Sequence, residues 1–149
     1  MKTTALDGKR VRGESKNEKI EYQNQRILIV EDDKTLEPIW TFVISKVNKK
    51  AEIDWATLEL EAEDLIFDAM RDGKQYDLVI VDIFLEGTRT GLDLYERFGH
   101  LFHNRMIITS GTEYQKYAEY LNTNSQAPYC LEKPLEPNQC VEIVNKMLH

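Results

Sequence analysis

The sequence predicts one doubly wound α/β domain, in which helices cover both faces of a parallel sheet. From Arg26 onward, short apolar runs rich in β-branched residues alternate with longer segments of helical period. Consecutive apolar positions are typical of strands that are buried on both faces of a parallel sheet. The chain of 149 residues is long enough for one domain with a sizeable core. This alternation requires right-handed crossovers and places helices on both sides of the sheet.

Five strands are expected, three of them from strong apolar runs and two from weaker ones. In chain order they cover residues 27–30, 51–56, 78–81, 106–108 and 129–131. We expect the common strand order 2-1-3-4-5. Strands 1 and 3 then lie side by side at the topological switch point, and a ligand would bind beyond their carboxyl ends.

Five helices are expected from apolar stripes of helical period. In the first, Pro38 has to fall in the first turn, where its missing N–H costs little, and Thr35 is the expected cap. The stripes consist of Leu36, Ile39, Trp40, Val43, Ile44 and Val47; Ala62, Leu65, Ile66, Ala69 and Met70; Leu92, Tyr95, Phe98, Leu101 and Phe102; Tyr114, Tyr117, Ala118 and Leu121; and Cys140, Val141, Val144, Met147 and Leu148.

Residues 1–25 differ in composition from the rest of the chain. They contain six basic and four acidic residues, a net charge of +2, but only scattered apolar ones. Such a segment buries too little apolar surface to offset the entropy of ordering. We expect a flexible arm over residues 1–25 and one domain over residues 26–149.

The overall composition excludes several function classes. The chain has 19 Lys and Arg against 26 Asp and Glu, a net charge of −7, so direct binding of nucleic acid is not expected. No segment has the apolar length of a membrane span or of a secretory signal, and we expect a cytoplasmic protein without membrane insertion. Cys130 and Cys140 have no companions at metal-ligand spacing, so both are expected to be reduced thiols.

Polar residues follow the predicted strands at one edge of the sheet. They are Glu31, Asp32 and Asp33 after the first strand, Asp82 after the third, Ser110 after the fourth and Lys133 after the fifth. Each alone is ordinary cap or turn chemistry. Together they form a self-repelling group of carboxylates, which requires a cation or a shared proton.

These residue types suit a hard metal ion and phosphoryl transfer. Mg²⁺ prefers carboxylate, carbonyl and water oxygens, and a carboxylate beside it can act as a nucleophile and form an acyl phosphate. The transferred group needs cations and donors around its oxygens, which Lys133 and Ser110 supply. No glycine-rich phosphate loop follows the first strand, and His100 and His103 have no nucleophile motif nearby.

Four segments together resemble the receiver domain of two-component response regulators. RILIVEDD resembles the family's first strand with its acidic pair, and LVIVDIFLEG resembles its phosphoacceptor strand and loop. MIITSG resembles the strand that ends in a hydroxyl residue, and CLEKPLE resembles the Lys-Pro corner. The resemblance extends from about Arg26 to His149 and implies a flavodoxin-like fold. Because we expect no output domain to follow, the expected protein is a stand-alone receiver, similar to the chemotaxis response regulator.

The resemblance implies a role for each site residue. Asp82 would be the phosphoacceptor, and Mg²⁺ would be bound by Asp32 and Asp82 directly, by Glu31 through water and by the backbone carbonyl of Phe84. Ser110 would bind the phosphoryl group in the active state, and Lys133 would pair with it. The Lys133–Pro134 peptide bond would be cis, and Asp33 is expected to be a helix-start residue.

The sequence departs from the family pattern at two places. Glu86 replaces the proline that commonly follows the phosphoacceptor by four residues, in a loop that is one residue longer than usual. Cys130 occupies the position of the switch aromatic, with Tyr129 one place earlier. A shift of one residue moves a strand side chain to the other face, so Tyr129 does not simply replace that aromatic.

The expected function is a signalling switch that catalyses only its own phosphorylation and slow dephosphorylation. The phosphoryl donor would be a sensor histidine kinase or a histidine phosphotransfer protein, and the output a downstream protein contact or onward phosphotransfer. One alternative is a degenerate receiver that acts as a scaffold. Another is an aspartate-nucleophile phosphohydrolase, which would commonly need a second carboxylate where Phe84 stands.

Overall fold

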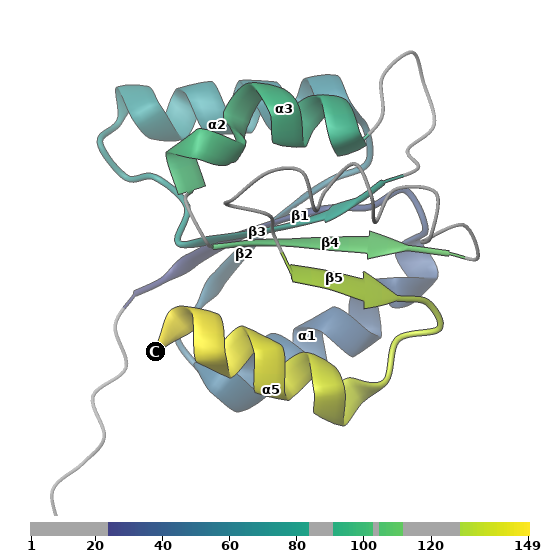
Figure 1. Ribbon diagram of the computed structural model, residues 1–149. Helices are drawn as coiled ribbons and strands as arrows, with labels where there is room; N and C mark the ends of the chain where they lie inside the picture. The colour runs from purple at the N-terminus through teal and green to yellow at the C-terminus, as the bar shows by residue number, and fades with distance from the viewer. Residues whose placement is uncertain (1–23, 84–90, 103–104, 112–128) are drawn as a thin grey trace, which may run out of the picture.

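The computed structural model describes residues 24–83, 91–102, 105–111 and 129–149. These residues form a five-stranded sheet in the order β2-β1-β3-β4-β5, and every neighbouring pair is parallel. Helices α1 and α5 cover one face of the sheet, and α2 and α3 cover the other (Figure 1). The predicted doubly wound class and its strand order are confirmed.

The strands coincide with the predicted apolar runs to within two residues at either end. They are β1 (Arg26–Val30), β2 (Glu52–Ala56), β3 (Leu78–Asp82), β4 (Met106–Ser110) and β5 (Tyr129–Glu132). The register aligns Val30 of β1 with Val81 of β3, and Asp82 of β3 with Thr109 of β4. The carboxyl ends of the three central strands therefore lie at one edge of the sheet.

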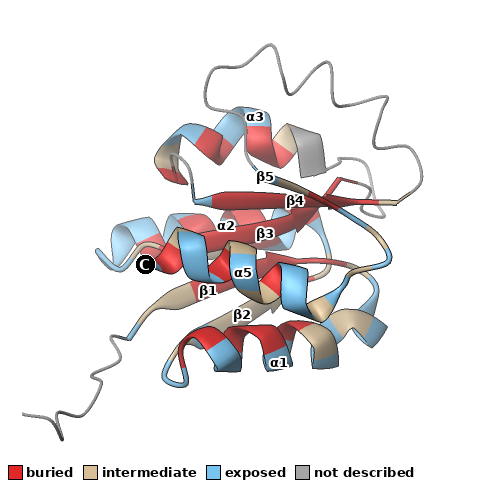
Figure 2. Ribbon diagram, turned by 60° about the horizontal axis from the view of Figure 1, so that its bottom comes forward, coloured by how far each residue is buried: buried red, intermediate tan, exposed pale blue. Residues whose placement is uncertain are grey.

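The core consists of two apolar layers, one on each face of the sheet. Alternate strand residues point to opposite faces, so Leu28 and Val30 pack under α2 and α3, whereas Ile27 and Ile29 pack against α1 and α5. Every residue of β3 and β4 is buried (Figure 2). Burying one such aliphatic side chain contributes roughly 1.5 to 3 kcal/mol, which explains why uninterrupted apolar runs become the central strands.

The first helix begins differently from the prediction. A 3-10 turn, η1 (Lys34–Leu36), precedes α1 (Glu37–Val47), and Asp33 caps this turn by accepting a hydrogen bond from the backbone N–H of Thr35 at 3.0 Å. The predicted Thr35 cap is therefore wrong, and the expectation that Asp33 starts the helix is confirmed. Pro38 does lie in the first turn of α1.

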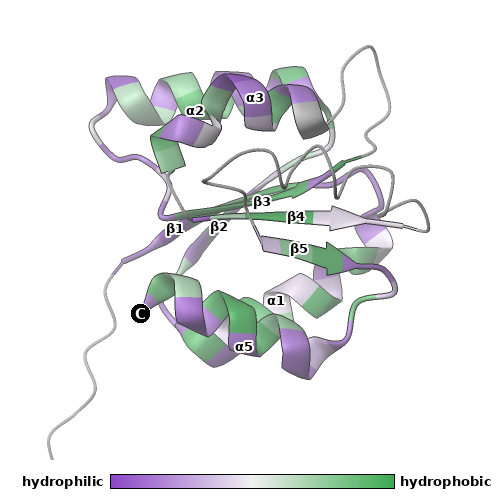
Figure 3. Cartoon of the chain, in the orientation of Figure 1, coloured by the Kyte–Doolittle hydropathy of each residue, from purple (hydrophilic) through white to green (hydrophobic). Residues whose placement is uncertain are grey.

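The remaining helices are α2 (Glu59–Arg71), α3 (Gly91–Phe102) and α5 (Pro137–Leu148). Their residues alternate between hydrophobic and hydrophilic along the chain (Figure 3). Most of each predicted stripe is buried or packed against the core, but Met70 is exposed, so its place in the second stripe is wrong. The side chain of Leu92 and the predicted fourth helix lie outside the described residues.

Hydrogen bonds fix the start of β1 at the edge of the sheet that is opposite to the acidic residues. Asn48, just after α1, donates to Gln25 Oε1 at 2.7 Å, and Gln25 Nε2 donates to the carbonyl of Leu148 at 3.2 Å. The backbone N–H of Arg26 donates to Asp77 at 2.9 Å. The ends of α1 and α5 are thus joined to the strand whose other end carries the acidic residues.

Candidate functional site

Three carboxylates converge at the carboxyl edge of the sheet. Glu31 and Asp32 follow β1, and Asp82 ends the neighbouring strand β3; one oxygen from each lies within 4.8 Å of the others. Within the described segments of the chain, no other group of three acidic, histidine or cysteine side chains meets in this way. Glu31 and Asp82 are buried and Asp32 is half-buried. The structure brings together these three predicted residues.

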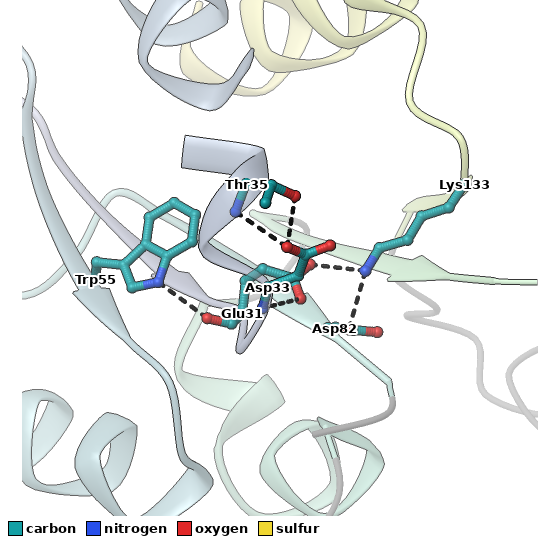
Figure 4. Close-up of polar contacts among 6 residues, drawn as sticks. All are labelled: Glu31, Asp33, Thr35, Trp55, Asp82 and Lys133. Carbon is teal, nitrogen blue, oxygen red and sulfur yellow. Dashed lines mark hydrogen bonds and ion pairs between the residues drawn. The ribbon is translucent and has the colours of Figure 1, made fainter. Parts of the chain in front are cut away.

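Lys133 enters the site from the end of β5 and contacts two of the carboxylates. Its Nζ donates to Glu31 Oε1 at 2.8 Å and to Asp82 Oδ2 at 3.0 Å (Figure 4). The Lys133–Pro134 peptide bond is cis, as the resemblance implies. The ammonium group therefore balances part of the negative charge of the cluster.

Burial and charge shift the acid–base properties of this pair. Burial raises the pKa of Glu31 to about 7, with a further rise from the charge of Asp82 and a partial reduction by the Lys133 hydrogen bond. Burial of the Lys133 ammonium lowers its pKa, but the hydrogen bonds to Glu31 and Asp82 outweigh this effect and leave that pKa raised. Lys133 is therefore a permanent cation at neutral pH.

Ser110 contributes a hydroxyl group without a partner. It ends β4, its backbone carbonyl accepts a hydrogen bond from Lys133 N at 2.7 Å, and the residue is almost completely buried. Among the described residues and their contacts, Ser110 Oγ has no hydrogen-bond partner. A buried, unsatisfied hydroxyl group is costly, which points to a ligand oxygen as its partner.

Three contacts of Glu31 escaped the sequence analysis. Trp55 of β2 donates its indole N–H to the Glu31 carbonyl at 2.9 Å, and Glu31 N donates to the carbonyl of Ala56 at 2.9 Å. Asp33 N donates to Glu31 Oε2 at 3.1 Å. Figure 4 shows Trp55 and Lys133 approaching Glu31 from different sides. No sequence signal indicates the direction of the Trp55 ring, because β2 is an edge strand with partly exposed residues.

Tyr129 and Cys130 point to opposite faces of β5. Cys130 packs against the core layer under α2 and α3, whereas Leu131 belongs to the layer under α1 and α5. Tyr129 is on the side of α5, and its hydroxyl accepts a hydrogen bond from Lys146 at 2.6 Å. On the face of the sheet that Ser110 and residue 130 share, β5 therefore carries a cysteine in place of the family's aromatic residue. Phe84 and Glu86 lie outside the described residues.

Comparison with known proteins agrees with this geometry. The response regulator receiver domain model matches residues 27–145. No curated protein is similar enough in sequence to count as a relative. In the described segments, no helix is sufficiently long and apolar to cross a bilayer.

Several solved structures share the fold. A putative response regulator from Chloroflexus aurantiacus J-10-fl is 22% identical, with a TM-score of 0.68 over 85% of this chain and 98% of that chain. A CheY-like receiver domain protein from Methanospirillum hungatei JF-1 is 22% identical, with a TM-score of 0.68 over 85% of this chain and 94% of that chain. The phosphorylated cyanobacterial phytochrome response regulator RcpA is 14% identical, with a TM-score of 0.66 over 84% of this chain and 91% of that chain.

At these identities the solved structures support the fold alone, whereas the family model covers most of the chain. The order of the strands, the acidic cluster and the Lys-Pro corner agree with that match. The chain belongs to the family of response regulator receiver domains of two-component systems.

Proposed function

We propose that this chain is a phosphorylation-activated signalling switch of a two-component system or phosphorelay. In this proposal Asp82 accepts a phosphoryl group from a phosphohistidine of a sensor histidine kinase or a histidine phosphotransfer protein. The single most important support is the convergence of Glu31, Asp32 and Asp82 within 4.8 Å, with Lys133 bonded to two of them. A nucleophilic carboxylate, negative ligands for a cation and a fixed positive charge are thereby in one place.

The proposed reaction is a displacement at phosphorus. A carboxylate oxygen of Asp82 forms the new P–O bond, the P–N bond of the phosphohistidine breaks, and its electron pair returns to the imidazole nitrogen, which takes up a proton. The product is an acyl phosphate on Asp82. Catalysis of this step depends on positioning and on charge stabilisation rather than on further covalent chemistry.

The donor set fits Mg²⁺. Three carboxylates offer hard oxygens, and Mg²⁺ usually binds through one or two carboxylates and retains several waters. Asp32 and Asp82 would bind the ion directly and Glu31 through water; the backbone carbonyl of Phe84 is a further proposed ligand outside the described residues. When bound, the ion would supply positive charge to the phosphoryl oxygens.

Lys133 and Ser110 would hold the transferred group. Lys133 Nζ lies 3.0 Å from Asp82 Oδ2, so a phosphoryl oxygen on Asp82 falls within reach of the same ammonium group. The partnerless hydroxyl group of Ser110 would donate to another phosphoryl oxygen. Together they would make the phosphorylated state differ in contacts from the free state, which is the requirement for a switch.

The output is proposed to be contact with a downstream protein or onward phosphotransfer. We assign the receiver to residues 26–149 and the protein to the cytoplasm. The domain would catalyse only its own phosphorylation and slow dephosphorylation, as expected of a signalling domain.

The test is incubation of the protein with Mg²⁺ and a small acyl phosphate donor, followed by intact-mass measurement. We expect a stable gain of one phosphoryl group, abolished by Asp82→Asn and retained by Asp72→Asn, which changes an exposed carboxylate at the end of α2. No gain under any condition would support the scaffold alternative. Rapid multiple turnover of the donor would support the phosphohydrolase, and phosphorylation of Asp82→Asn would refute the assignment.

A further inference from the structure

Exposed apolar side chains gather on one helix of this protein. Among the described residues, six large hydrophobic side chains are exposed, and four of them are on α2 or at its N-cap: Leu58, Leu60, Phe67 and Met70. Scattered exposed hydrophobic residues are ordinary, but a group on one element commonly marks an interaction site.

The two exposed hydrophobic residues elsewhere are partly covered by lysine. The ammonium group of Lys46 lies 5.5 Å from the ring centroid of Phe42, and that of Lys146 lies 5.1 Å from that of Tyr129. Phe67 instead contacts another aromatic ring, Phe98 of α3, edge to face at 5.4 Å between centroids. Phe67 therefore packs against the buried Phe98 on one side and is still exposed on the other.

The spacing on α2 produces a stripe rather than isolated residues. Leu60 and Phe67 are seven residues apart, so they lie two turns apart on one side of the helix, and Met70 lies on the turn after Phe67. Their exposed fractions are 55%, 47% and 47%. A stripe of this kind fits the apolar face of another helix.

The polar side chains beside the stripe are mostly acidic. Arg97 of α3 pairs with the buried Glu59 and Glu63, at 3.3 Å and 2.6 Å, and so balances charge within the fold. The exposed charged residues of α2 are Glu61, Asp64, Asp68 and Arg71. Three acidic residues and one arginine give this exposed face a net charge of −2, and the arginine already pairs with Asp68 at 2.5 Å.

We propose that the exposed face of α2 is a docking surface for a cationic amphipathic helix of a protein partner. The stripe would bind the apolar face of that helix, and Glu61, Asp64 and Asp68 would attract its lysine or arginine side chains. A second copy of this chain fits less well, because a two-fold contact would place these carboxylates against themselves. Anionic lipid surfaces and nucleic acid are disfavoured by the same charge.

This surface is separate from the acidic site at the sheet edge. Helix α2 covers the face of the sheet opposite α1 and α5 (Figure 1). The lysine that bonds to Glu31 and Asp82 follows β5 and does not come from α2. The proposal therefore does not depend on phosphorylation of Asp82, and phosphorylation can be measured separately in the same variants.

The test uses the full chain and a dye-labelled leucine–lysine peptide of about 18 residues, long enough to form an amphipathic helix. A leucine–glutamate peptide of the same pattern is the control probe. Fluorescence anisotropy is measured at about 0.15 M salt, where weak long-range attraction is screened. The variants are the double substitution Leu60→Gln with Phe67→Gln, the charge reversal Asp64→Lys, and the matched control Phe42→Gln on α1.

We expect the cationic peptide alone to bind, with amide chemical-shift changes centred on α2. Binding should weaken at least about tenfold in the double variant and severalfold in Asp64→Lys, and stay within about twofold in Phe42→Gln. Circular dichroism verifies folding; if the double variant is unfolded, Asp64→Lys alone decides, because it changes an exposed side chain. Equal loss in Phe42→Gln, or equal binding of both peptides, would overturn the proposal. A dimer that the double variant dissociates would instead identify a second copy as the occupant.

Discussion

Replacement of Lys133 by methionine should destabilise the protein and should do so most at high pH. The side chains of Glu31 and Asp82 are only 3% and 7% exposed, so the substitution takes from two neighbouring buried carboxylates the ammonium group that they share. Removal of one partner of a buried ion pair costs about 3 to 5 kcal/mol. Because Lys133 itself is 23% exposed, we expect about 3 kcal/mol.

The pH dependence follows from Glu31. Its pKa in the folded protein is raised from 4.5 to about 7, so the folded state holds more protons than the unfolded state across this window. The free energy of unfolding therefore falls as the pH rises from about 4.5 to about 7. Removal of Lys133 also removes a hydrogen bond that lowers this pKa, so the decline should extend to higher pH in the variant.

The assay is thermal unfolding at pH 5 and pH 8 with a chelator present, beside the exposed control Lys49→Met. At pH 8 the melting temperature of Lys133→Met should be lower by on the order of 10 °C, and the difference should shrink at pH 5. Added Mg²⁺ should recover part of the loss, because it would supply positive charge at the same position. Equal melting temperatures of wild type and variant at pH 8 would refute the coupling of these three side chains.

Three further predictions concern single residues. Trp55→Phe leaves the Glu31 carbonyl without its indole donor, and titration should show roughly tenfold weaker Mg²⁺ binding in a folded protein; unchanged affinity would contradict this role. Ser110→Ala removes a partnerless hydroxyl group, so chemical denaturation should show stability unchanged or higher by about 1 kcal/mol, while phosphorylation slows. Burial raises the pKa of Cys140 to about 11, so mass spectrometry after alkylation at pH 8 should find the less buried Cys130 modified first; the reverse order would contradict the described packing.

The fold and the convergence of the site could be predicted because both follow from local pattern and one topological rule. The run 78–81 is apolar at every position, short and rich in β-branched residues, which is typical of a strand that is buried on both faces. Once these strands are parallel neighbours, the residues after them must meet at one edge. Asp82 beside Glu31 is thus a consequence of strand order, although 51 residues separate them in the chain.

Details that depend on the direction of one side chain could not be predicted. Thr35 and Asp33 both have side chains that cap helices, and only the extra 3-10 turn decides between them. Met70 fits the helical period of α2 as well as Ala69 does, but Ala69 is buried and Met70 is exposed, which the period alone does not decide. The bond from Trp55 to Glu31 depends on the rotamer of an edge-strand residue, which periodicity does not specify.

The bond between Glu31 and Lys133 joins residues that are 102 positions apart, one after the first strand and one after the last. A contact of such long range is expected to form late in folding, because closing the long loop between the two residues costs entropy before the contact itself can stabilise the chain. A folding intermediate that contains β1 and β3 but lacks β5 would bring Glu31 near Asp82 without the lysine that balances them. Charge repulsion at the sheet edge would then oppose that intermediate, and docking of β5 would relieve it. The acidic site therefore favours completion of the sheet, because the ammonium group of Lys133 reaches Glu31 and Asp82 only when the last strand is in place.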